Sequence, residues 1–178
     1  SAQELEWEPS PFAMGELGVK YLHIPFISDD PAYLPTVEAV DDIRGAYRVM
    51  LDYCPTAIAN VLRAIAAHGG TSLYHCASGK DRTGLISLFL LKLADAPDDA
   101  IAADFAVSKE NLWPVWLKMV ADAGGLDNIH PWFEPVTDAA DMLATIEYIN
   151  SKYGSVEQYL AGGGLTDEEM NRLRQILL

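Results

Sequence analysis

Residues 75–84 of this chain, His-Cys-Ala-Ser-Gly-Lys-Asp-Arg-Thr-Gly, carry the side chains with the clearest chemistry. Five residues separate Cys76 from Arg82, between an apolar stretch at 71–75 and another at 85–94. A short loop that enters a helix points backbone amides and the positive end of the helix dipole at one place. The planar guanidinium of Arg82 can hold two phosphate oxygens at once. The spacing therefore predicts a pocket for a phosphate dianion.

Cys76 is the predicted nucleophile of this pocket. The same amides and guanidinium stabilise a thiolate, so we expect the pKa of Cys76 to lie well below the free value of about 8.5. Gly79 allows a tight turn and a close approach of the backbone to the phosphate. A cysteine that only packs in the core is the alternative, but the position of Arg82 six residues later argues against it.

The loop resembles the signature of the cysteine-dependent protein tyrosine phosphatases, in which a cysteine, five residues, an arginine and a serine or threonine follow one another. With His75, Gly79, Lys80 and Asp81 in place, it is most similar to a bacterial branch that acts on phosphotyrosine and, in some members, on phosphoserine, phosphothreonine or phosphoinositides. The resemblance covers nearly the whole chain. Its softer matches lie at residues 21–26, 101–105, 154–160 and 164–166, and at Ser108.

The resemblance implies a role for each residue of the loop. Arg82 would hold the equatorial oxygens of the transferred phosphoryl group, Thr83 would assist breakdown of a phosphocysteine, and His75 would order the loop. Lys80 would favour doubly charged or lipid head-group substrates. From the residues alone, Thr83 can instead cap the helix, His75 can be a satisfied core histidine, and Lys80 can be a solvated surface lysine. The implied phosphate-binding residues are Ala77, Ser78, Gly79, Lys80, Asp81 and Arg82.

The general acid has three candidates, because a leaving phenolate or alkoxide needs a proton from a neutral carboxyl group. In the resembled branch an aspartate inside the loop has this role, which makes Asp81 the first candidate. Asp30 and Asp29 rank after it, since dual-specificity phosphatases keep a mobile acid loop at this place. From the residues alone, Asp81 could cap the helix or brace Lys80, and the other two could form an ordinary turn before Pro31.

The fold is predicted to be α/β and phosphatase-like, with a central, mostly parallel sheet flanked by helices and a helix-rich C-terminal half. The 178 residues are expected to form one domain, residues 1–178. Strands are expected at 19–26 and 71–75. Because two strands make only a marginal sheet, we expect this chain to be the C-terminal portion of a longer domain that supplies further N-terminal strands.

Helices are expected where apolar residues recur at helical spacing. Such stretches cover residues 37–51 and 85–94. Residues 98–107 and 109–123 are predicted as two helices, with a break or kink at Pro114. The residues predicted to begin or end helices are Pro55, Gly69, Thr137, Ser155 with Gln158, and Thr166 with Glu169.

Composition excludes several classes of function. The formal charge is −14, from 26 acidic and 12 basic side chains, which disfavours nucleic acid and anionic membrane surfaces. No apolar run approaches the roughly 18 residues of a membrane span. The four histidines lack ligand spacing, so neither a metal nor an organic cofactor is expected. Core packing is favoured over a lid for the aromatic residues Trp113, Trp116, Trp132 and Phe133.

Two cysteines provide no disulfide framework, which favours a reduced, cytoplasmic protein. Cys54 could protect Cys76 as a reversible disulfide, but packing in the core is the favoured interpretation because sequence separation says nothing of distance.

The predicted function is that of a phosphomonoester hydrolase, a protein tyrosine or dual-specificity phosphatase that works through a phosphocysteine. Phosphorylated protein is the first choice of substrate and phosphoinositide the second. A non-catalytic, phosphate-binding module is the alternative. A Walker nucleotide loop is excluded, because Tyr74 and Asp81 stand where that motif needs glycine and serine or threonine. A sulfurtransferase of the rhodanese type would not require Arg82 followed by Thr83.

Overall fold

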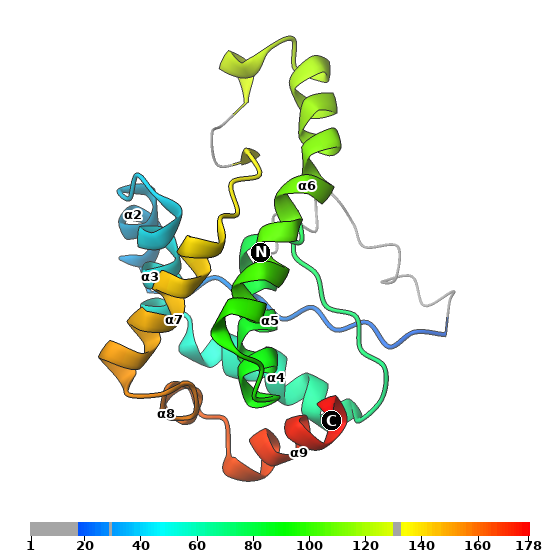
Figure 1. The fold of residues 1–178 in the computed structure, drawn as a ribbon, viewed down its shortest axis with the longest axis vertical. Coiled ribbons are helices and arrows are strands. Elements are labelled where there is room, and N and C mark those ends of the chain that lie inside the picture. Colours follow the sequence, from blue (N-terminus) through cyan, green and yellow to red (C-terminus); the bar gives the residue numbers. More distant parts are fainter. Residues whose placement is uncertain (1–17, 29, 130–132) are drawn as a thin grey trace.

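The structure is a computed structural model that describes residues 18–28, 30–129 and 133–178. All regular elements in these ranges are helical (Figure 1). They are α2 (Tyr33–Glu38), α3 (Ile43–Tyr53), α4 (Pro55–His68), α5 (Asp81–Leu93), α6 (Asp98–Asp122), the 3-10 turn η2 (Leu126–Asn128), α7 (Ala139–Tyr153), α8 (Val156–Gly162) and α9 (Asp167–Leu177).

The predicted central sheet is wrong. Within the described ranges no residue is assigned to a strand, and both 19–26 and 71–75 run as irregular chain. In Figure 1 the segment between α4 and α5 passes along the outside of the helical body, and its Leu73 side chain is 76 % exposed. A strand exists only when its backbone pairs with a neighbour about 4.8 Å away. The apolar residues of these segments were therefore insufficient to predict a sheet.

Helix α5 lies at the centre of the hydrophobic core. Leu85, Leu88, Phe89 and Leu93 are all fully buried along it, and it packs against α4, α6, α8 and α9. The Phe89 ring stacks on that of Tyr159 at 5.1 Å between centroids. Each such buried side chain stabilises the fold by roughly 1.5–3 kcal/mol. The first turn of α5, which carries Arg82, thus belongs to a helix that is anchored in the core.

Most of the predicted helix ends are confirmed. Pro55 is the first residue of α4, and Gly69 ends it in the left-handed conformation at φ 67°. Ser155 accepts a hydrogen bond from the Gln158 amide at the start of α8. Thr166 and Glu169 form a reciprocal capping box at the start of α9. These caps depend on residues within three positions of one another, which is why the sequence reveals them.

The prediction for Thr137 is wrong. Asp138 is the N-cap of α7, and the buried Thr137 hydroxyl instead donates to the Ala106 carbonyl of α6 at 3.4 Å. The helix predicted at 37–51 is also divided, since α2 ends at Glu38 and Asp42 caps a separate α3 by accepting from the Gly45 amide. The division at Asp42 comes from a local cap that the apolar spacing does not reveal, whereas Thr137 is turned toward a distant carbonyl of α6.

Helix α6 is one helix of 25 residues, and the break predicted at Pro114 is absent. Proline removes one backbone donor from a helix and usually costs about 3 kcal/mol there, yet α6 runs through Pro114 without interruption. The C-terminal half of α6 projects away from the helical body (Figure 1). Several of its apolar side chains are exposed, namely Trp113, Val115, Leu117 and Met119.

Candidate active site

The loop at residues 76–80 leads directly into α5, whose later turns are buried in the core. Lys80 is the N-cap and Asp81 the first residue of the helix. Gly79 has φ 65°, where side-chain-bearing residues are strained, and an added Cβ there would meet nothing within 4 Å. Its glycine is therefore required by backbone conformation. Gly84 is required by space instead, since a Cβ would lie 3.0 Å from the Phe105 ring of α6.

A pocket of about 220 Å³ opens beside this loop. Cys76, Asp81 and Arg82 all face it, so the structure brings together the predicted nucleophile, the first-ranked acid and the predicted clamp. The full set of lining residues is Met50, Cys76, Ala77, Ser78, Asp81, Arg82 and Phe133. A second, smaller cavity of about 50 Å³ lies behind the loop and is lined in part by Gly79 and Thr83.

The environment of Cys76 favours a thiolate. Burial alone would raise the pKa of this thiol, but the nearby Thr83 hydroxyl, the Thr83 amide, the Arg82 charge and the Gly79 amide together lower the pKa below its ordinary value. A thiolate that is stabilised at a helix N-terminus in this way is the reactive form of cysteine. The prediction of a lowered pKa at Cys76 is thus supported by named donors.

Thr83 lies next to the sulfur and away from solvent. Its hydroxyl oxygen is buried and makes no hydrogen bond of ordinary length and angle within the described structure, yet it is close enough to Cys76 to lower the pKa of the thiol. A hydroxyl hydrogen can rotate toward a sulfur anion when one forms, so this proximity is enough for Thr83 to stabilise the thiolate. Its placement agrees with the role that the family resemblance implies.

Asp81 is a buried carboxyl group, 9 % exposed. Burial raises the pKa of Asp81 above its ordinary value, and the opposing effects of the Lys80 charge, the Tyr47 hydroxyl and the Arg82 charge do not cancel that rise. Its Oδ1 accepts a hydrogen bond from the Tyr47 hydroxyl at 2.9 Å. Such a carboxyl group can stay protonated at a pH where an exposed aspartate is ionised, as a general acid must.

The structure contradicts two alternatives that the sequence left open, a solvated surface lysine at position 80 and a core histidine at position 75. Lys80 is only 5 % exposed, and its Nζ donates to the Glu134 carbonyl at 2.9 Å and lies 3.7 Å from Oδ2 of Asp81. It is therefore not a solvated surface lysine. The His75 side chain is exposed and is not part of the core. Its Nδ1 lies 3.1 Å from the Cys76 carbonyl, which can only accept, so this nitrogen carries the proton.

Asp30 lies outside the pocket. Its side chain is exposed, and Oδ1 accepts from the Ala32 amide at 2.8 Å in a local turn that leads into α2. This matches the alternative of an ordinary acidic turn before Pro31. Asp29 lies outside the residues that the structure describes. Among the two candidates that are described, only Asp81 lines the pocket with Cys76.

The family model described as the tyrosine phosphatase family matches residues 1–178, the whole of this chain. The chain belongs to the tyrosine phosphatase family. The family resemblance predicted from the loop is therefore confirmed.

Curated bacterial relatives agree with this assignment. A tyrosine-protein phosphatase from Nostoc commune is 32 % identical over 143 residues, which are 75 % of this chain and 48 % of the relative. The triple specificity protein phosphatase PtpB from Mycobacterium tuberculosis is 29 % identical over 136 residues, which are 68 % of this chain and 49 % of that protein. The chain spans about half the length of these relatives.

The signature motif does not include three further residues of the site. Tyr47 and Met50 belong to the apolar spacing of α3, where nothing distinguishes them from other core positions. Phe133, for which core packing was favoured, is 49 % exposed and lines the pocket. That preference is also wrong for Trp113, which is 39 % exposed. Contacts between distant segments decide all of these placements.

Cys54, the other cysteine, lies away from the loop in the sequence. Cys54 forms no disulfide and is buried in the core, as favoured, and burial raises the pKa of its thiol. Within the described ranges, no three histidine, cysteine or acidic side chains gather as a metal site would need. None of the helices described there has the length and apolar character needed to cross a bilayer.

Proposed function

We propose that this protein hydrolyses phosphomonoesters, as a protein tyrosine phosphatase with activity toward other phosphorylated residues, through a phosphocysteine on Cys76. One observation carries the proposal: Cys76, Asp81 and Arg82 share a single pocket, and the pKa of the thiol is lowered there despite its burial. Membership of the tyrosine phosphatase family supports it. A pocket that only bound phosphate would need no thiolate.

In the first step the Cys76 sulfur attacks phosphorus in line with the leaving oxygen. The S–P bond forms as the P–O bond breaks, and the Asp81 carboxyl group gives its proton to the leaving oxygen. Arg82 and the loop amides hold the other phosphoryl oxygens while charge develops on them. Asp81 serves as the general acid, because its burial favours the protonated form of its carboxyl group.

In the second step water attacks the phosphocysteine. The new O–P bond forms as the S–P bond breaks, a proton of the water passes to the Asp81 carboxylate, and inorganic phosphate leaves. Thr83 donates to the departing thiolate, which its position beside the sulfur supports. The Asp81 carboxyl group and the Cys76 thiolate are regenerated, so the cycle needs no further reactant.

A phosphotyrosine side chain is the substrate that the pocket supports best. Met50 and Phe133 add apolar walls to the pocket that the loop begins, and a thioether and an aromatic ring both pack well against a phenyl ring. A phosphoinositide remains second, because the Lys80 ammonium is buried against the Glu134 carbonyl. With both cysteines outside disulfides, a reducing compartment such as the cytoplasm suits the proposed chemistry.

Hydrolysis of 4-nitrophenyl phosphate by the full-length protein tests the proposal. Cys76→Ser should abolish turnover. The control variant Cys54→Ala changes the second cysteine, which is buried in the core, and should retain most of the activity. Activity should persist in a chelator and be inhibited by vanadate, since only protein groups take part. Full activity in Cys76→Ser, or a strict need for Mg²⁺, would contradict the mechanism. Binding of a phosphotyrosine peptide without turnover would favour the non-catalytic alternative.

A further inference from the structure

We propose that Tyr47 is a positioning residue for the general acid: its hydroxyl holds Oδ1 of Asp81, so that the transferable proton resides on Oδ2. The inference rests on the proposed function and adds to it a residue of α3 that lies outside the signature loop. Tyr47 is 34 positions from Asp81 in the sequence, and their side chains meet at 2.9 Å.

The contact lies on the buried side of Asp81. Tyr47 is fully buried, so little water can compete for the hydrogen bond to Oδ1, while the Asp81 side chain also lines the pocket. A hydrogen bond between buried polar groups fixes geometry more firmly than one at the surface, because no solvent partner can replace it. The Asp81 carboxyl group therefore has one preferred rotation about its terminal bond.

The direction of this hydrogen bond decides where the acid proton lies. Burial raises the pKa of Tyr47 far above its ordinary value, and the nearby charges of Asp81, Asp141 and Cys76 raise it further. The phenol therefore stays protonated and donates. In a neutral carboxyl group the better acceptor is the carbonyl oxygen. Because Oδ1 accepts from Tyr47, the proton of the neutral Asp81 is on Oδ2.

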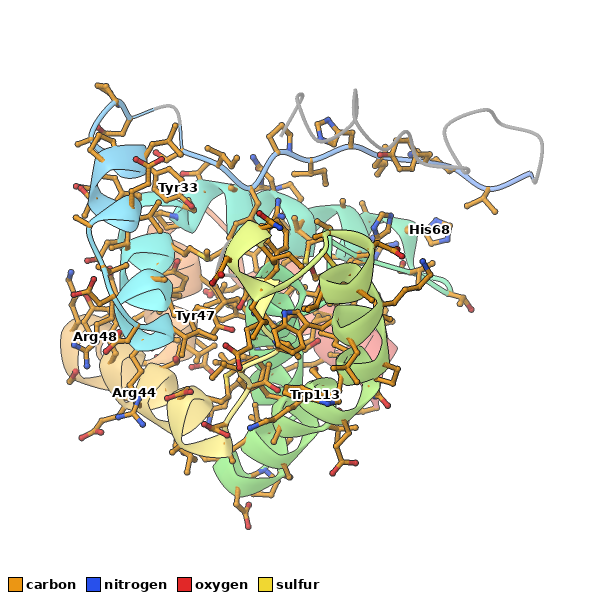
Figure 2. The ribbon with its side chains drawn as sticks, turned by 90° about the horizontal axis from the view of Figure 1, so that it is seen from above. Tyr33, Arg44, Tyr47, Arg48, His68 and Trp113 are labelled. Carbon is orange, nitrogen blue, oxygen red and sulfur yellow. The ribbon has the colours of Figure 1, made fainter. Side chains whose placement is uncertain are left out.

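Tyr47 is itself held in place. Its ring meets that of Phe105 edge-on, with centroids 6.0 Å apart and planes at 73°, and Phe105 closes against Gly84 of α5. Figure 2 shows Tyr47 on the inner side of α3, while Arg44 and Arg48 point outward from the same helix. The phenol is thus clamped between α3 and α6, and small errors in the position of a catalytic group are costly to the rate.

The other charges around Asp81 come from the loop and its helix. The Lys80 ammonium lies 3.7 Å from Oδ2, and the Arg82 charge also acts on the carboxyl group. Both favour the ionised form and neither depends on the Tyr47 hydroxyl. A change at Tyr47 therefore isolates one contribution, the hydrogen bond to Oδ1.

The test is the pH dependence of kcat/KM, which reports the first step, for Tyr47→Phe in the full-length protein. The general acid of that step must be protonated, so kcat/KM falls as pH rises through the pKa of Asp81. The Tyr47 hydroxyl favours the carboxylate, so its removal raises that pKa and moves the alkaline limb of the profile to higher pH. Loss of orientation should lower kcat/KM roughly tenfold for a phosphotyrosine peptide. An activated ester, 4-nitrophenyl phosphate, should change much less, because its leaving group needs little protonation.

Tyr159→Phe is the matched control. Tyr159 is equally buried, and its hydroxyl donates to the Leu51 carbonyl at 2.9 Å, away from Asp81. Both variants lose one buried phenol hydroxyl and should lose similar thermal stability. Only Tyr47→Phe should move the alkaline limb. Asp81→Asn serves as the reference and should remove that limb altogether.

A second variant provides an independent test in case Tyr47→Phe folds poorly. Tyr47→3-fluorotyrosine retains the ring and strengthens the donor, so the alkaline limb should move to lower pH. Limbs that coincide with wild type in both variants would overturn the positioning role while leaving the phosphatase activity intact. An alkaline limb that survives in Asp81→Asn would also overturn it. Failure of the proposed function is distinct, because it appears as turnover in Cys76→Ser.

Discussion

Replacing Thr83 with valine should raise the pKa of the Cys76 thiol. Valine keeps the shape of threonine and removes the hydroxyl that stabilises the sulfur anion. A hydrogen bond to a charged group contributes about 1.5–3 kcal/mol. The lower end of this energy range applies, because the hydroxyl does not make a hydrogen bond of ordinary geometry. The Thr83 amide, the Gly79 amide and the Arg82 charge also continue to stabilise the thiolate in the variant. About 1.4 kcal/mol corresponds to one pH unit in the titration midpoint.

The assay is the rate of alkylation by iodoacetamide as a function of pH, followed by peptide mapping of Cys76. Only the thiolate reacts, so the midpoint of the rate profile in Thr83→Val should lie about one pH unit above that of wild type. At a pH between the two midpoints, alkylation should be several-fold slower. Cys54 gives little background because it is buried and the pKa of its thiol is raised.

Ser87→Ala is the control for this experiment. Ser87 also lies on α5, and its hydroxyl pairs with that of Tyr74 at 2.9 Å. Its removal should leave the alkylation midpoint unchanged. If Thr83→Val had the same midpoint as wild type, the thiolate would not depend on this hydroxyl and the reasoning would be refuted. An equal rise in Ser87→Ala would mean that any change in α5 disturbs the loop.

Two further predictions concern stability. Gly163→Ala should destabilise the fold by about 1–3 kcal/mol in urea unfolding. The reason is that the added Cβ would lie 2.6 Å from the Pro55 carbonyl oxygen. Unchanged stability would mean that α8 can move away from α4. Burial alone would raise the pKa of Asp52, but hydrogen bonds from Lys152, Tyr153 and Tyr148 lower it, so Asp52→Asn should lose about 1 kcal/mol at neutral pH, discounted for partial exposure. That difference should be constant above the unfolded pKa of about 4 and vanish as pH falls through the folded value; a difference that persists in acid would argue against the ionic contribution.

Features of this chain that depend on neighbouring residues were predictable, and features that depend on distant contacts were not. The chemistry of the loop was predictable because Cys76, Gly79 and Arg82 lie within seven consecutive residues that lead into a helix. Over so short a distance, backbone geometry leaves few ways to arrange a thiol, amides and a guanidinium. The caps at Gly69 and Thr166 were predictable for the same reason, since each depends on neighbours within a single turn.

The predicted sheet, in contrast, was wrong, because the apolar stretches at 19–26 and 71–75 did not suffice to predict strands. A strand needs a pairing partner from another segment, and no pattern within one segment specifies that partner. The continuity of α6 through Pro114 was likewise not decided by the proline alone, because a helix can tolerate one missing donor when its surroundings allow.

The sequence alone predicted a sulfur nucleophile and a guanidinium within one short loop, and it left three aspartates as candidates for the acid. Only the tertiary structure decided which acid reaches the pocket and what orients it. Asp81 is distinguished from Asp30 by its burial and by the phenol of Tyr47, and Met50 and Phe133 become pocket walls through packing. The physical reason is that covalent spacing fixes the geometry of neighbours, whereas burial and contacts between distant residues exist only once the chain has folded.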